Sequence, residues 1–115
     1  PETKQMASDL IERIISLGKV YDLTRKDLSA QGVNLSELLN SVVHLHKTDQ
    51  ALSIEGPRVF VDTEVVNTLT LIVHELTTNS AKYGALSVPD GDLSISWDRD
   101  DDGTVRVTWR ELVPT

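Results

Sequence analysis

Apolar residues recur at helical spacing in the first part of the 115-residue chain. The stripe consists of residues that stand three or four positions apart: Met6, Leu10, Ile14, Leu17 and Tyr21. This spacing predicts an amphipathic helix over about residues 3–23. Further apolar residues make the stripe wider than one partner surface needs. We therefore expect this helix to pack against a second copy or an upstream helix, as in a dimeric four-helix bundle.

A second helix is predicted to begin near Asn34, because Asn34 and Glu37 form a capping pattern before an apolar stripe. The apolar residues of this stripe are Leu38, Leu39, Val42, Val43 and Leu45. Short strands are expected over 52–54 and 58–61, on either side of a Gly-Pro turn.

The second half of the chain predicts a long helix and a β-hairpin. Asp62 or Thr63 can cap a helix of about 20 residues that ends at Gly84. After a turn at 88–91, two strands alternate with period two and share one apolar face: Leu93, Ile95, Trp97, Val105, Val107 and Trp109. The order of elements predicts an α+β fold, a two-layer α/β sandwich with helices on one face of a mixed sheet.

One face of the third helix is polar and could carry chemistry. Thr68, Glu75, Asn79 and Lys82 fall within a narrow arc opposite the apolar face. On spacing alone, this arc is an ordinary solvated helix face. The alternative is a site for Mg²⁺ and a triphosphate, because an amide oxygen is a hard ligand and a lysine can meet phosphate as a point charge.

Composition and charge limit the classes of function. The chain has no cysteine, which excludes disulfides, thiolate metal sites and a cysteine nucleophile. The net charge is -7, and residues 61–115 hold four basic and ten acidic side chains, which argues against nucleic acid as the main partner. No apolar run approaches the roughly 20 residues of a membrane span, and residues 1–9 do not resemble a signal peptide, so we expect a cytoplasmic protein. Without an initiator Met, the chain is expected to be a fragment.

Three other groups of residues have simpler explanations than ligand binding. His44 and His46 stand two apart, whereas metal ligands on a helix prefer three or four, so we expect surface or capping roles. The segment 98–103 imitates the start of an EF-hand loop, but Trp109 stands where the bidentate Glu is needed, which favours a solvated turn. Trp97 and Trp109 are expected in the core.

Two segments carry a resemblance to a known family. Residues 74–86 read HELTTNSAKYGAL and, with the Ser, Pro, Gly and Trp that follow up to position 97, closely resemble the N box of the HWE group of sensor histidine kinases. Residues 109–111 read WRE and resemble that group's Trp-x-Glu element. The group's name refers to such a His, Trp and Glu, here His74, Trp109 and Glu111. Residues 13–23 resemble, more weakly, the second helix of the family's dimerisation and phosphotransfer region.

The resemblance implies a division of the chain. Residues 1–30 would be the C-terminal part of the dimerisation and phosphotransfer helical region. Residues 31–115 would be the ATP-binding catalytic domain, a sandwich of the histidine-kinase or Bergerat ATPase type, without its lid and glycine-rich boxes. The phospho-acceptor histidine would lie upstream of Pro1. Residues 112–114 read LVP where the family has a Gly-Gly-Pro-like turn. Because the lid and the glycine-rich boxes that hold the nucleotide would be missing, we expect the fragment alone to bind ATP poorly.

The resemblance also implies roles for single residues. Asn79 would ligate the Mg²⁺ held by the ATP phosphates, Lys82 would contact phosphate, and Tyr83 would lie near the nucleotide. Glu75 would lie beside the Mg²⁺ or its waters, where related ATPases place their general base. The implied reaction is transfer of the γ-phosphoryl to a histidine and then to an aspartate of a response regulator. An ATP-independent histidine phosphotransferase and a non-catalytic module that docks the regulator are the alternatives.

Glu111 is expected to meet His74. Period-two alternation places Glu111 on the apolar strand face, where a carboxylate needs a partner. His74 lies about 100° round the helix from Glu75, so it can reach the sheet edge while Glu75 faces the nucleotide. A hydrogen bond from His74 to Glu111 would hold Glu75 and Asn79 in place. His74 thus joins Glu75 as a candidate catalytic residue, and Glu111 joins the candidate nucleotide-binding residues. Alternatively, Glu111 lies beyond the strand end and faces water.

Overall fold

The structure is a computed structural model of the chain that describes residues 8–19 and 32–114. Its elements are β1 (Ser8–Lys19), β2 (Gly32–Asn34), α2 (Leu35–Val43), β3 (Ala51–Glu55), β4 (Phe60–Asp62), α3 (Thr63–Tyr83), the 3-10 helix η2 (Ala85–Ser87), β5 (Asp92–Arg99) and β6 (Thr104–Pro114). Within these residues a four-stranded sheet has the order β1-β6-β5-β3, and β2 pairs with β4. Strands β3 and β5 are parallel, whereas β6 is antiparallel to both of its neighbours.

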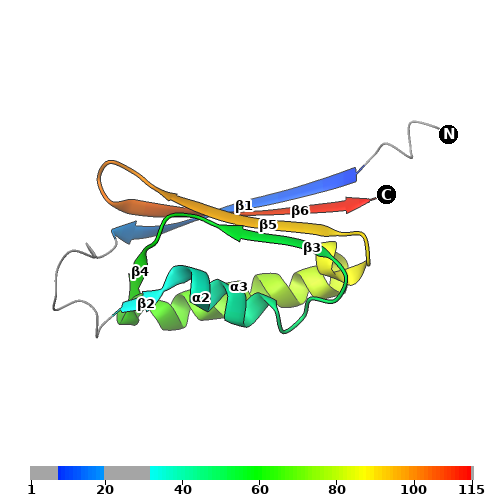
Figure 1. The fold of residues 1–115 in the computed structure, drawn as a ribbon, viewed down its shortest axis with the longest axis horizontal. Coiled ribbons are helices and arrows are strands. Elements are labelled where there is room, and N and C mark those ends of the chain that lie inside the picture. Colours follow the sequence, from blue (N-terminus) through cyan, green and yellow to red (C-terminus); the bar gives the residue numbers. More distant parts are fainter. Residues whose placement is uncertain (1–7, 20–31, 115) are drawn as a thin grey trace.

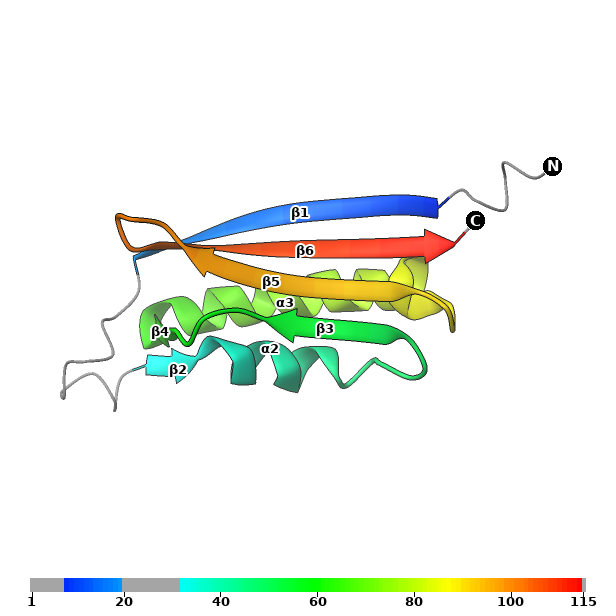
Figure 2. The same cartoon turned by 45° about the horizontal axis from the view of Figure 1, so that its top comes forward.

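The helices form a second layer on one face of this mixed sheet. In Figure 1, α2 and α3 lie on the same side of strands β1, β6, β5 and β3. Figure 2 shows the strands of this sheet side by side, with α3 passing behind β5 and β3 and α2 next to β3. The predicted α+β arrangement, with helices on one face of a mixed sheet, is thus confirmed. In the described part of the chain, no helix combines the length and the apolar character needed to cross a bilayer.

The segment for which the spacing predicted a first helix is a strand. β1 runs antiparallel to β6, with Ile11 opposite Glu111 and Ile15 opposite Val107. The helix predicted over 3–23, and the dimerisation helix expected in 1–30, are therefore wrong for residues 8–19. Isoleucine favours strands because its branched side chain packs well on a pleated surface, and here β6 offers a long partner.

The rest of that prediction lies outside the described residues. The four-helix bundle loses its structural basis over 8–19, because a strand paired with β6 cannot also supply a bundle helix. The division of the chain at residue 30 stays a prediction. Strand β1 precedes this boundary but belongs to the same sheet as β6, which follows it.

The second helix begins where the capping pattern predicted. Asn34 is the N-cap of α2, and its Oδ1 accepts a hydrogen bond from the backbone N–H of Glu37 at 3.1 Å. The expected apolar residues of α2 are buried: Leu38, Leu39, Val42 and Val43. Leu45 was expected in the same stripe, but it follows the end of the helix and is 74% exposed. The apolar stripe therefore ends with the helix.

Asn34→Ala is expected to lower the free energy of unfolding by about 1 kcal/mol, because the first turn of α2 loses its side-chain acceptor. Urea denaturation measures the change. Asn67→Ala, at an exposed position within α3, is the matched control and should stay within about 0.5 kcal/mol of the wild type. Equal stability of the two variants would contradict the capping role.

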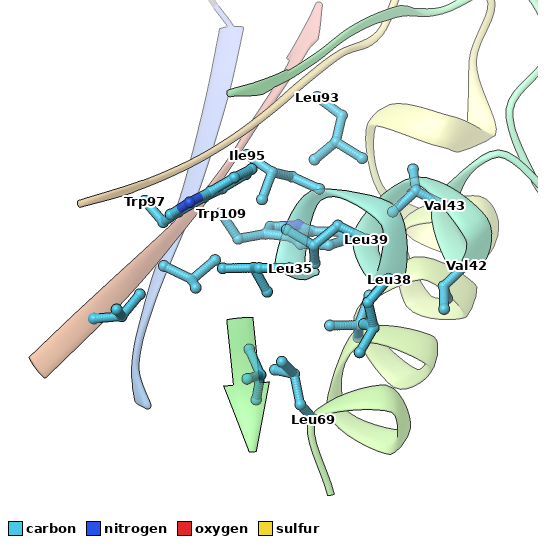
Figure 3. Packing of buried hydrophobic residues seen from close by; sticks show 14 of the residues in the cluster. Leu35, Leu38, Leu39, Val42, Val43, Leu69, Leu93, Ile95, Trp97 and Trp109 are labelled. Carbon is cyan, nitrogen blue, oxygen red and sulfur yellow. The ribbon is translucent and has the colours of Figure 1, made fainter. Parts of the chain in front are cut away.

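The core lies between the helices and the sheet. Figure 3 shows Leu35 and Leu39 of α2 packed toward Ile95 and Trp109 of the sheet. Both tryptophans are buried, as expected, with Trp97 5% and Trp109 0% exposed. The alternating apolar face predicted for the hairpin is therefore the face that meets the helices.

The third helix has the predicted limits and the predicted faces. Asp62 caps its start, accepting a hydrogen bond from the Glu64 N–H at 2.9 Å, and Gly84 is its C-cap. The buried side chains of α3 are Leu69, Val73, Thr77 and Ser80. The polar arc of Thr68, Glu75, Asn79 and Lys82 is exposed. The end of α3 at Gly84 brings the chain back to the sheet, next to β6.

Candidate functional site

A cavity of about 560 Å³ lies where the last turns of α3 face β1 and β6. Its walls are formed by eight residues: Ile11 and Arg13 of β1, Glu111 of β6, Leu76, Asn79, Ser80 and Tyr83 of α3, and Gly84. The volume is in the range of small-molecule sites, and polar groups from α3, β1 and β6 converge on the cavity.

A buried carboxylate joins the elements around this cavity. Glu111 is 5% exposed. Its Oε1 accepts hydrogen bonds from the Ser80 hydroxyl at 2.6 Å and from the Ala85 N–H at 2.9 Å, and its Oε2 accepts one from the Trp109 indole N–H at 2.8 Å. The Ser80 oxygen in turn accepts from the Leu86 N–H at 3.1 Å. Glu111 therefore fixes the end of α3 and the start of η2 to strand β6.

Gly84 allows the Glu111 carboxylate to come this close. A Cβ atom at Gly84 would contact Glu111 Oε1 and would lie 3.1 Å from the Ser80 Cα. The Gly84 N–H donates to the Ser80 carbonyl at 2.9 Å, which closes the last turn of the helix. The Tyr-Gly pair in the HELTTNSAKYGAL segment thus has a steric reason: the helix must end without a side chain beside the carboxylate.

The expected hydrogen bond between His74 and Glu111 is wrong. Both oxygens of Glu111 are taken up by other donors, and its partner Ser80 lies about 9 Å further along the helix axis than His74. The His74 ring instead packs edge-to-face against His46, with ring centroids 6.3 Å apart. The alternative of a solvent-facing Glu111 is also wrong, because the side chain is buried. That a carboxylate on this face needs a partner is confirmed.

The cavity brings together some of the predicted site residues. Asn79, Tyr83 and Glu111 line it, and Tyr83 is 80% exposed at its edge. Glu75 and Lys82 are exposed on α3 and are not among the lining residues. The polar face of the third helix therefore exists as predicted. Of its four residues, Asn79 is the one that lines the cavity.

Two polar residues of the cavity were missed. The helix pattern gives Ser80 no special role, and only the position of Glu111 shows that its hydroxyl has a buried acceptor. Arg13 was assigned to a helix. Had β1 been recognised as a strand, period-two alternation would have placed Arg13 on the same face as Ile11 and Ile15.

The simpler explanations fit the remaining candidates. His44 Nε2 lies 3.1 Å from Asn40 Oδ1 within the same helical region, so this histidine has a local polar partner. In the hairpin turn, Asp100 pairs with Arg106 at 2.6 Å, and Asp102 accepts a hydrogen bond from the Thr104 N–H at 2.9 Å. These are contacts of a solvated turn.

The donor set at the cavity fits a Mg²⁺ ion delivered by a phosphate ligand. Magnesium keeps several waters and is commonly bound through one or two protein oxygens together with substrate phosphates. Asn79 offers such an oxygen at the cavity wall, from a helix whose end is fixed by the Glu111 network.

Sequence comparison relates the chain to histidine kinases. It is 34% identical over 113 residues to a protein named Blue-light-activated histidine kinase 1 from Erythrobacter litoralis, which covers 96% of this chain and 31% of that protein. It is 33% identical over 110 residues to a Blue-light-activated histidine kinase from Rhizobium johnstonii, covering 92% of the chain and 30% of the relative. A protein of the same name from Brucella anthropi is 33% identical over 98 residues, covering 82% and 20%.

The chain spans less than a third of the length of each of these relatives. No protein-family model matches it. The similarity extends over most of the chain and includes strands and helices on both sides of the cavity. From this similarity, together with its HELTTNSAKYGAL and WRE segments, the chain belongs to the HWE family of histidine kinases.

Proposed function

We propose that the chain is the nucleotide-binding part of a sensor histidine kinase, with a sandwich of the Bergerat ATPase type. The observation that carries this proposal is that Asn79 and Tyr83, both from the HELTTNSAKYGAL segment, line one cavity with Glu111 of the WRE segment. The two segments that resemble the family therefore meet at a space of ligand size. The names of the relatives support ATP as the phosphoryl donor.

Asn79 and Tyr83 have the most direct roles in this proposal. The Asn79 amide oxygen ligates the Mg²⁺ of the nucleotide, and the Tyr83 ring lies beside the nucleotide. Lys82 contacts phosphate, and Glu75 orients water at the metal. Glu75 and Lys82 are exposed on the same helix, so a ligand that extends beyond the cavity along α3 comes within their reach.

Glu111 and His74 act as positioning residues. Three donors occupy the two oxygens of Glu111, so its contribution is to hold the end of α3, and with it Asn79, at the cavity. The His74 ring packs against His46 and thereby braces the helix next to Glu75. Such fixed geometry supports catalysis by orientation, which is the main contribution of a protein to phosphoryl transfer.

For the whole protein, the proposal implies transfer of a γ-phosphoryl group to a histidine and then to an aspartate of a response regulator. The residues of this chain bind and orient the donor. Dimerisation of the whole protein stays a prediction.

Asn79→Ala in the full-length protein is expected to weaken Mg-ATP binding by roughly 10- to 100-fold, because the metal loses its protein ligand. Titration calorimetry with and without Mg²⁺ measures the affinity. Asn67→Ala, the same substitution at an exposed position nearer the start of α3, should leave the affinity unchanged. Autophosphorylation should fall together with binding.

Mg-ATP titration of the wild type separates a kinase from the two alternative functions, and a transfer assay with a phosphorylated regulator separates these two from each other. An ATP-independent phosphotransferase would not bind Mg-ATP but would accept a phosphoryl group from a phosphorylated regulator. A docking module would bind the regulator without either activity. Full Mg-ATP affinity in Asn79→Ala would remove Asn79 from the site.

A further inference from the structure

A positively charged side chain lies at the cavity on the strand side. Arg13 of β1 lines the cavity that Asn79 borders from α3. Arg13 stands directly opposite Trp109 in the antiparallel pair of β1 and β6. Directly opposed residues point to the same face of a sheet, and Trp109 is buried under the helices. The register therefore places Arg13 on the sheet face that packs against the helices, where its side chain is exposed and borders the cavity.

The cavity does not neutralise this guanidinium. Glu111 is the acidic residue among the described lining residues, and its two oxygens already accept three hydrogen bonds from other groups. Within residues 8–19 and 32–114, the ion pairs join Arg106 to Asp100 and Arg110 to Glu12, and neither includes Arg13. The cavity thus combines a satisfied buried carboxylate with an arginine whose charge is available to a ligand.

We propose that Arg13 binds a phosphate group of the nucleotide, from the side of the cavity opposite to helix α3. This inference rests on the proposed nucleotide site and adds a residue to it. A guanidinium presents a planar set of donors that matches phosphate oxygens in a bidentate manner. The chain carries a net charge of -7, which repels a polyanion, so a local cation at the binding cavity favours its entry.

The Arg13 site differs from the roles expected on the third helix. Lys82 is exposed on α3 and does not line the cavity, whereas Arg13 does. A phosphate held between Asn79 and Arg13 therefore has contacts from two elements. Because Glu111 already holds α3 against β6, and β1 pairs with β6, these two contacts are joined through one strand.

Arg13→Gln in the full-length protein tests the contact. Mg-ATP should bind about tenfold more weakly or worse, since a charge-assisted hydrogen bond is lost, while adenosine, which has no phosphate, should bind as to the wild type. Arg13→Lys should recover part of the Mg-ATP affinity, because lysine keeps the positive charge. The recovery should be incomplete, because lysine lacks the planar donor pair of the guanidinium. Competition titration against a fluorescent nucleotide gives all of these affinities.

Arg110→Gln is the matched control. Arg110 is an exposed arginine next to the Arg13–Trp109 pair, but it lies on the other face of the sheet and pairs with Glu12 at 3.1 Å. This variant should leave both affinities unchanged. Unchanged Mg-ATP affinity in Arg13→Gln, or equal losses for adenosine and Mg-ATP, would overturn the role of Arg13.

Failure of this inference can be told from failure of the nucleotide site. If the wild type binds Mg-ATP and Asn79→Ala weakens that binding, while Arg13→Gln does not, the site stands and the Arg13 contact is wrong. If the wild type shows no Mg-ATP binding, the proposed function and the inference both fail.

Discussion

Glu111→Ala is expected to lower the free energy of unfolding by about 4 kcal/mol. The truncation leaves the Ser80 hydroxyl, the Ala85 N–H and the Trp109 indole N–H without their acceptor in a buried region. Each buried donor without a partner costs roughly 1–3 kcal/mol. Water that enters the space of the lost side chain recovers part of this loss. Urea denaturation, monitored by tryptophan fluorescence, measures the change.

Two further variants sharpen this test. Glu111→Gln keeps the shape but turns an NH₂ group toward at least one of the three donors, so we expect an intermediate loss of about 2 kcal/mol. Glu55→Ala is the control, because this glutamate is exposed on β3 and accepts one hydrogen bond, from Ser53 at 3.2 Å. It should change stability by less than about 0.5 kcal/mol. Equal stability of Glu111→Ala and Glu55→Ala would disprove the network.

The elements that could be predicted from the sequence are those with local signals. α2 and α3 begin at Asn34 and Asp62, whose side chains accept from the first turn, and this signal involves residues two or three apart. The hairpin is equally local, because a short turn joins two strands of matching alternation. Gly103, with a φ of 89°, supplies the left-handed residue of that turn.

The first strand could not be predicted in the same way, because its stabilising partner is distant in sequence. Ile11, Ile14 and Ile15 fit both a helical stripe and a strand, and their spacing does not decide between the two. The strand is decided by its pairing with β6. This pairing places Glu12 opposite Arg110, and the Arg110 Nε lies 3.1 Å from the Glu12 Oε2. The sequence offers no local sign of such a register, and Arg13 was therefore missed as a residue of the cavity.

The partner of Glu111 was missed for a related reason. The strand pattern correctly required a partner for a carboxylate on the apolar face, and the family resemblance suggested His74. The actual donors include a backbone N–H, that of Ala85, which no side-chain pattern can indicate. The choice between His74 and Ser80 depends on how far β6 reaches along α3, which is a property of the packed structure. The sequence can thus identify a site residue such as Glu111, whereas its contacts are seen only in the folded structure.

Gly91→Ala is expected to lower the free energy of unfolding by about 3 kcal/mol or more. The added Cβ would contact the Ala85 carbonyl oxygen and would lie 2.6 Å from the carbonyl carbon and 2.8 Å from the Cα of that residue. These are backbone atoms, and the N–H of Ala85 is held by Glu111. On the other side, the Gly91 N–H donates to the Val88 carbonyl, and the Gly91 carbonyl accepts from the Ala51 N–H, each at 3.2 Å. Neither segment can move without the loss of a hydrogen bond.

The effect of Gly91→Ala should come from this close approach and not from backbone torsion, because among the described glycines the positive φ belongs to Gly103. Asp90→Ala, at an exposed position of the same turn, controls for changes in the turn itself and should cost less than about 0.5 kcal/mol. Urea denaturation of the two variants gives the difference. If Gly91→Ala were as stable as Asp90→Ala, η2 would not be fixed against the turn, and the Glu111 network could not hold the cavity wall as described. A large loss of stability in Gly91→Ala alone would instead indicate that the turn containing Gly91, η2 and the end of α3 are packed together as one unit beside Asn79.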